Sequence, residues 1–142
     1  TNYVPHPSSV LSVQQTDGAR RHYVMLPRVV AAAQAYYGCS TLTRVPLEEQ
    51  GGDGSAFSHW EARYMYSEIM APVVSDFPRV SSLTLALLED SGWYKPDYSQ
   101  VGPFHFGKGR GCGFLTDECV VNSHTSFPDT FCTEAEASSC TS

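Results

Sequence analysis

The chain has 142 residues, of which 42% are hydrophobic and 17% are charged, and its formal net charge is -6. This is the composition of a folded globular domain, since disordered chains carry more charge and fewer apolar residues. The acidic balance and the lack of a Lys/Arg cluster argue against a nucleic-acid surface, which needs cations to displace counterions. The sequence also lacks a run of about 18 apolar residues that would span a bilayer.

The chain begins with "TNYVPHPSS", which has neither a basic start nor an apolar centre. We therefore expect a processed or truncated end, with any signal peptide or membrane anchor outside these residues. The cysteines, at positions 39, 112, 119, 132 and 140, form no CxxC pair. This pattern favours disulfides in an oxidising compartment over a zinc ribbon. Because five cysteines is an odd number, at least one pairs outside the chain or remains a free thiol.

Two β-compatible stretches lie within residues 10–26, on either side of Asp17 and Gly18. An Asp-Gly pair favours the positive φ angles of a tight turn, so this region predicts a β-hairpin. The next segment, "PRVVAAAQAYYG", predicts a helix near residues 27–37. Pro27 suits its first turn and Gly38 suits a left-handed cap after its last turn.

Residues 40–54 are loop-like and include the glycine-rich stretch "GGDG". A second helix is predicted near residues 81–91, with Ser81 or Ser82 as the N-cap and Gly92 after its last turn. The following tail is rich in Gly, Pro, Ser and Cys and shows no sustained period, which indicates loops linked by disulfides. We therefore expect an α+β fold with an N-terminal hairpin, two main helices and an irregular, disulfide-stapled tail.

Several enzyme chemistries have little support in the sequence. No GxSxG motif marks a catalytic serine. The stretch "GKGRGCG", residues 107–113, lacks the spacing and terminal Ser/Thr of a P-loop, so a cysteine-anchored loop is the better interpretation. A nucleophilic Cys112 assisted by His105 or His124 is conceivable, but the neighbouring cysteines favour a disulfide.

The histidines, at positions 6, 22, 59, 105 and 124, are scattered singly. None belongs to an HExxH motif, which would place two imidazoles on one helix face toward a zinc ion. On these terms His59 is a surface or hydrogen-bonded residue, and Met70 is a core residue. The residues by themselves indicate a secreted globular fragment.

Three segments are informative about the protein family: "GSAFSHWEARYMYSEIMAP", "LTLALLEDSGWYKPDYS" and "GCGFLTDEC". In this order and spacing they resemble the central region of the leishmanolysin family, surface zinc metalloproteases of trypanosomatids with invadolysin relatives. The resemblance covers most of residues 36–132. Members of this family are metzincins, in which an HExxH helix supplies two zinc-binding histidines and the general-base glutamate.

The resemblance implies that His59 is the third zinc ligand and that Met70 is the methionine of the Met-turn. The stretch "GGDGSAFS" would let the backbone bend toward the distant active-site helix. The resemblance also implies a disulfide between Cys39 and Cys112, whereas the cysteines at 119, 132 and 140 would have partners further along a longer chain. The general base is expected upstream, so no catalytic residue is assigned to this chain.

By the same resemblance the fold is of the metzincin C-terminal subdomain type. Residues 1–111 would form the central domain with the third ligand and the Met-turn, and residues 112–142 the start of a disulfide-rich C-terminal domain. Zinc would lie at an edge of the unit, with His59 pointing outward. Pro72 stands where some metzincins have tyrosine, and it agrees with the leishmanolysin version of the turn.

The implied function is part of a zinc-dependent metalloendopeptidase that cleaves peptide bonds with a zinc-activated water. Its partners would be protein or peptide substrates, with residues 71–77 in the substrate cleft, and an upstream HExxH domain. The chain alone would be inactive. We expect an extracellular or cell-surface protein, anchored to a membrane by a segment outside this chain. The alternative is a non-catalytic, disulfide-stapled surface or adhesion module of the same family, which the missing HExxH favours.

Overall fold

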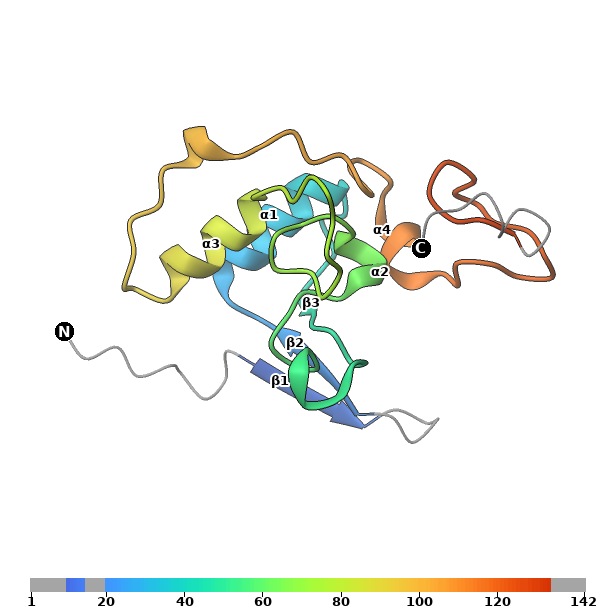
Figure 1. The fold of residues 1–142 in the computed structure, drawn as a ribbon, viewed down its shortest axis with the longest axis horizontal. Helices are drawn as coiled ribbons and strands as arrows, with labels where there is room; N and C mark the ends of the chain where they lie inside the picture. Colours follow the sequence, from blue (N-terminus) through green and yellow to red (C-terminus); the bar gives the residue numbers. More distant parts are fainter. Residues whose placement is uncertain (1–9, 15–19, 134–142) are drawn as a thin grey trace.

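The computed structural model describes residues 10–14 and 20–133 (Figure 1). Its helices are α1 (Pro27–Tyr37), α2 (Ala62–Met65), α3 (Ser82–Asp90) and α4 (Cys112–Thr116), with 3-10 turns η1 (Gly52–Gly54) and η2 (Tyr98–Gln100). Its strands are β1 (Val10–Gln14), β2 (Arg20–Val24) and β3 (Val45–Pro46). The predicted α+β class is confirmed.

The strands form one antiparallel sheet in the order β1-β2-β3. β1 and β2 make the predicted hairpin, with Val10 opposite Val24; the predicted turn at Asp17 and Gly18 lies outside the described residues. The segment expected to be a loop contributes β3, which is short because Pro46 has no backbone N–H to donate to a ladder.

α1 begins and ends as the sequence predicts. Pro27 is its first residue, and Gly38 follows the last turn with a φ of 72°. The Gly38 N–H donates to the Gln34 carbonyl at 3.0 Å, which satisfies one of the last carbonyl groups of the helix. Glycine suits this left-handed position because it has no Cβ.

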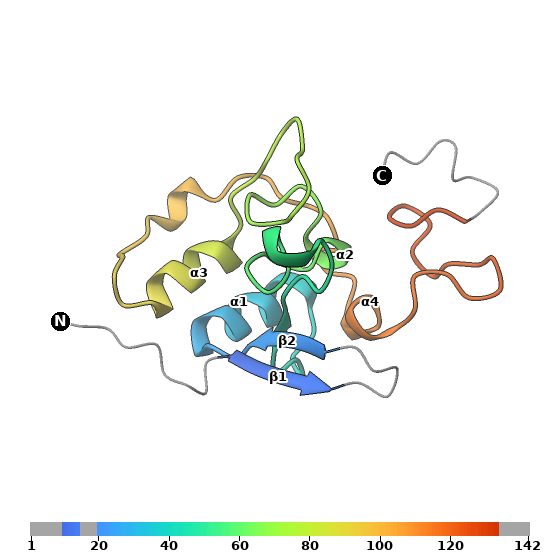
Figure 2. The ribbon, with the colours of Figure 1, turned by 60° about the horizontal axis from the view of Figure 1, so that its bottom comes forward.

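α3 is also confirmed. The Ser81 hydroxyl accepts a hydrogen bond from the Thr84 N–H at 3.3 Å, so Ser81 is the N-cap. Gly92, just beyond the helix, has a φ of 72°. α1 and α3 lie side by side (Figures 1 and 2).

Most of the core forms where these two helices meet the segments that follow them. Its buried members include Val29, Ala33, Tyr37, Trp60, Met65, Leu83, Ala86, Phe104 and Phe114. In the described part of the chain, no helix has the length and apolar character needed to cross a membrane.

The tail is irregular apart from α4, which the sequence did not predict because five residues are too few to show a helical period. Residues 117–133 extend beyond α4, away from α3 (orange to red in Figures 1 and 2). The fully buried Phe114 ties this segment to the core, because its ring stacks on those of Tyr37 at 6.0 Å and Phe131 at 5.5 Å.

Candidate metal centre

His59 lies between η1 and α2, and it is partly exposed. Its Nδ1 is 3.1 Å from the Ser55 carbonyl oxygen and 2.9 Å from Ser58 Oγ. A carbonyl oxygen can only accept, and the Ser58 hydroxyl donates to the same carbonyl at 3.2 Å, so this geometry assigns the imidazole proton to Nδ1. The lone pair is then on Nε2, as in histidines that bind a metal through Nε2 while Nδ1–H is held by a carbonyl.

The backbone on both sides of His59 is held by hydrogen bonds. The Glu48 N–H donates to the His59 carbonyl at 2.9 Å, and the Trp60 N–H donates to the Met70 carbonyl at 2.9 Å. Leu47 and Trp60 also form an isolated antiparallel bridge, and Trp60 is fully buried. The structure therefore brings Met70 next to the residue that follows His59.

Met70 packs against the core and lies in a tight turn. The Glu68 N–H donates to the Met65 carbonyl at 2.9 Å, and the Ala71 N–H donates to the Glu68 carbonyl at 3.0 Å. Ser67, at the start of this turn, has a φ of 68°. The position suits a Met-turn, whereas the role of Met70 beneath a metal stays a prediction.

A buried polar network connects these segments. The Trp60 indole N–H donates to Thr84 Oγ1 at 2.9 Å, and the Thr84 hydroxyl donates to Glu68 Oε1 at 2.6 Å. The other carboxylate oxygen, Glu68 Oε2, accepts from the Met70 N–H at 2.6 Å. Our sequence reasoning missed Glu68; the available signal was an acidic residue two positions before Met70.

Two further glutamates lie close to His59. Glu48 is buried, and its carboxylate accepts from the Gln50 N–H at 2.8 Å and the Ala62 N–H at 3.1 Å, so it holds the loop backbone. Glu61 is half-buried. Burial, and to a lesser extent the Glu48 carboxylate, raises the pKa of Glu61 from 4.5 to about 6.

Of the other described histidines, one packs on the loop that carries His59 and two lie on other segments. The His22 ring packs on Phe57, with 3.9 Å between the ring centroids, while His105 and His124 are exposed. His6 lies outside the described residues. Within residues 10–14 and 20–133, no three His, Cys, Asp or Glu side chains gather as a metal site would require.

A disulfide joins Cys39 to Cys112, as the family resemblance implied. Cys112 is therefore unavailable as a nucleophile, and the hypothesis of a cysteine-based enzyme at this residue is wrong. Cys132 is also disulfide-bonded, so the expectation that it needs a partner outside this chain is wrong as well. Cys119 is a free thiol, and its Sγ accepts from Arg63 Nε–H at 2.8 Å.

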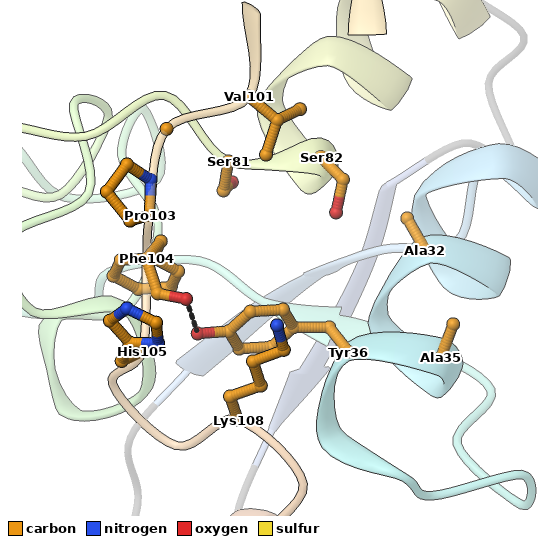
Figure 3. A pocket seen from close by; sticks show the side chains of 11 residues that line it. Ala32, Ala35, Tyr36, Ser81, Ser82, Val101, Pro103, Phe104, His105 and Lys108 are labelled. Carbon is orange, nitrogen blue, oxygen red and sulfur yellow. Dashed lines mark hydrogen bonds between the residues drawn. The ribbon is translucent and has the colours of Figure 1, made fainter. Parts of the chain in front are cut away.

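Two surface pockets lie elsewhere. One of about 390 Å³ lies between α1, the start of α3 and residues 101–108, where the Tyr36 hydroxyl donates to the Phe104 carbonyl at 3.1 Å (Figure 3). Another of about 630 Å³ lies among β2, β3 and residues 115–119. Neither pocket is lined by His59 or Met70.

The chain is similar to known proteins over most of its length. The family model described as Leishmanolysin, peptidase M8, matches residues 7–142. This chain belongs to the leishmanolysin family. The predicted recognition is thus confirmed, and the family is one of zinc metalloproteases. The fold is consistent with the metzincin subdomain type expected for it.

Relatives in this family include a leishmanolysin-like peptidase of Drosophila pseudoobscura pseudoobscura, 46% identical over 96 residues. A leishmanolysin homolog of Crithidia fasciculata is 44% identical over 110 residues, and leishmanolysin of Leishmania donovani is 42% identical over 107 residues. The matches cover 68%, 78% and 75% of this chain, but only 14%, 17% and 18% of the respective relatives. The chain therefore spans less than a fifth of their length.

Proposed function

We propose that this chain supplies the third zinc ligand, His59, and the Met-turn methionine, Met70, of a leishmanolysin-type zinc metalloendopeptidase. The observation that carries this proposal is the hydrogen bond from His59 Nδ1–H to the Ser55 carbonyl at 3.1 Å. It holds the imidazole in the tautomer whose Nε2 can bind zinc. The hydrogen bond from the Trp60 N–H to the Met70 carbonyl gives further support. Because Trp60 directly follows His59, this bond means that the segments carrying His59 and Met70 adjoin each other.

The remaining parts of the site would come from an HExxH segment preceding this chain, with two histidines and the general-base glutamate. Zinc, when bound by three imidazoles, keeps an open position at which it acidifies a water for attack on a peptide carbonyl. His59 would contribute a neutral nitrogen ligand to this set. Ser55 and Ser58 would keep its ring oriented.

Residues 71–77 would form part of the substrate cleft. Ala71 is buried beside Met70, whereas Val74 is 100% exposed and Phe77 is 72% exposed. The segment between α2 and α3 forms a long loop (Figure 2), and its exposed Val74 and Phe77 are available to contact apolar side chains of a peptide. The substrates would accordingly be proteins or peptides.

The disulfide between Cys39 and Cys112 suits an oxidising compartment. We therefore place the full-length protein outside the cell or at its surface, with membrane association through a segment outside this chain. The net charge of -6 gives no reason to expect a nucleic-acid partner.

The test replaces His59 by alanine in the complete polypeptide. Because one of three protein ligands is lost, bound zinc and peptidase activity should fall by at least about tenfold. His105→Ala, at an exposed histidine on another segment, is the matched control and should keep the wild-type zinc content and peptidase activity. Unchanged zinc content and activity in His59→Ala would refute the role of His59. A complete polypeptide without zinc or HExxH would instead indicate the non-catalytic surface module.

A further inference from the structure

The carboxylate of Glu68 is almost completely buried, with 1% of the residue exposed. Its Oε1 accepts three hydrogen bonds, from the Ser81 N–H at 3.0 Å, the Ser81 hydroxyl at 2.9 Å and the Thr84 hydroxyl at 2.6 Å. Its Oε2 accepts from the Met70 N–H at 2.6 Å. A carboxylate is costly to bury unless donors of this kind surround it.

Support of the first turn of α3 explains only half of this arrangement. Oε1 accepts from Ser81 and Thr84 at the start of the helix, whereas Oε2 accepts from the Met70 N–H, which lies outside α3. Ser81 already caps α3 through its own side chain. The orientation of Oε2 therefore calls for a second explanation.

The hydrogen bonds form a closed ring. Glu68 Oε2 accepts from the Met70 N–H, and the Met70 carbonyl accepts from the Trp60 N–H. The Trp60 indole N–H donates to the Thr84 hydroxyl, which in turn donates to Glu68 Oε1. Trp60 directly follows His59 in the chain. Hydrogen bonds in such a network strengthen one another, so we expect the loss of one to weaken the restraint on the backbone that carries His59.

We propose that Glu68 is a positioning residue for the zinc site, acting through the Met70 backbone on one side and through Thr84 and Trp60 on the other. Its carboxylate holds the His59 segment and the Met70 turn in one fixed arrangement. This role depends on the proposed function, because it requires that zinc bind at His59.

The first test is Glu68→Gln in the complete zinc-bound polypeptide. The amide oxygen of the new side chain can still accept from Ser81 and Thr84, but its NH₂ group then faces the Met70 N–H, so two donors oppose each other. We expect zinc affinity, measured by competition with a chromophoric chelator, to weaken by about tenfold or more. The visible absorption bands of the cobalt-substituted protein should also change, because they report the geometry of the ligands.

A second pair of variants tests the other side of the ring and keeps the proposal falsifiable if Glu68→Gln does not fold. Thr84→Val removes the hydroxyl that links Trp60 to Glu68, and Thr84→Ser restores it. Thr84→Val should weaken zinc binding as Glu68→Gln does, and Thr84→Ser should recover it. Val29→Ala, a core truncation in α1, is the control for general destabilisation; it should lower the melting temperature but leave zinc affinity and the cobalt spectrum unchanged.

The outcomes separate this role from the proposed function. If His59→Ala abolishes zinc binding while Glu68→Gln and Thr84→Val keep the wild-type affinity and spectrum, the positioning role is overturned and the zinc ligand stands. Equal weakening by Val29→Ala would also overturn it. If His59→Ala leaves zinc binding intact, both the ligand assignment and the positioning role are overturned.

Discussion

Glu61, two residues after His59, makes the stability of the protein depend on pH. Its pKa is raised from 4.5 to about 6, first by burial and then by the Glu48 carboxylate. The folded protein therefore binds this proton more tightly than the unfolded chain does. The unfavourable contribution of the ionised carboxylate is absent below pH 4.5, grows as the pH rises through the interval and is complete above pH 6.

Glu61→Gln should remove this contribution. The stability of the variant relative to wild type should increase between pH 4.5 and pH 6, by at most about 1 kcal/mol because Glu61 is only half-buried and water screens it. Urea unfolding on both sides of this interval measures the difference. The exposed Glu118→Gln is the control and should follow wild type. A Glu61→Gln profile parallel to wild type across the interval would contradict this account.

At the scale of elements, the start of α1 is stabilised by a residue of α3. No side chain at its own N-cap position, Leu26, accepts a hydrogen bond. Instead the Asp90 carboxylate accepts from the Arg28 N–H at 2.9 Å and the Val29 N–H at 3.2 Å, and its side chain is 4% exposed. The carboxylate thus satisfies two helix N–H groups and complements the positive end of the helix dipole.

Asp90→Ala should therefore lower the free energy of unfolding by about 1–2 kcal/mol, the usual cost of losing a helix N-cap. Asp90→Asn keeps an oxygen acceptor and should lose less. Asp129→Ala removes an aspartate from an exposed ion pair with Arg110, and it should cost less than about 1 kcal/mol. Chemical unfolding of the three variants tests this order. Equal losses in Asp90→Ala and Asp129→Ala would contradict it.

Local signals explain why some elements could be predicted from the sequence. Pro27, Gly38 and Ser81 act on neighbouring residues, so both main helices were predicted near their observed ends. α2 and α4 have only four and five residues and show no periodicity to read. The Asp90 carboxylate that caps α1 at the Arg28 N–H lies 62 residues away in the chain, and a local sequence pattern cannot predict such a contact.

At the scale of the whole molecule, the disulfide links the end of α1 to the start of α4 across 73 residues. Closing a loop of this length restricts the unfolded chain, a contribution of about 4 kcal/mol in the chain-entropy model. Replacing Cys39 and Cys112 together by serine should lower the free energy of unfolding by up to about this amount. Cys119→Ser, at the free thiol, should change it little. Thermal unfolding measures these effects, and a double variant that melts at the wild-type temperature would contradict a stabilising role of the disulfide.

The candidate site could be predicted only in part, because a metal site is shared among distant segments. Residue spacing alone does not identify His59 as a metal ligand. The prediction of this role comes from the family resemblance. The structure adds what neither provided, namely the Ser55 carbonyl that orients the ring and the Glu68 network behind it. The Ser55 carbonyl is a backbone group that carries no residue-type signal, and the bonds from Ser81 and Thr84 to Glu68 depend on how α3 packs against the Met70 turn.

The most direct test of the zinc role is an anomalous difference map, recorded at the zinc absorption edge, from crystals of the complete polypeptide. We predict a single strong peak bonded to Nε2 of His59, with Nδ1–H still donating to the Ser55 carbonyl. A zinc peak that has no bond to His59, or that is bonded through Nδ1, would contradict the account.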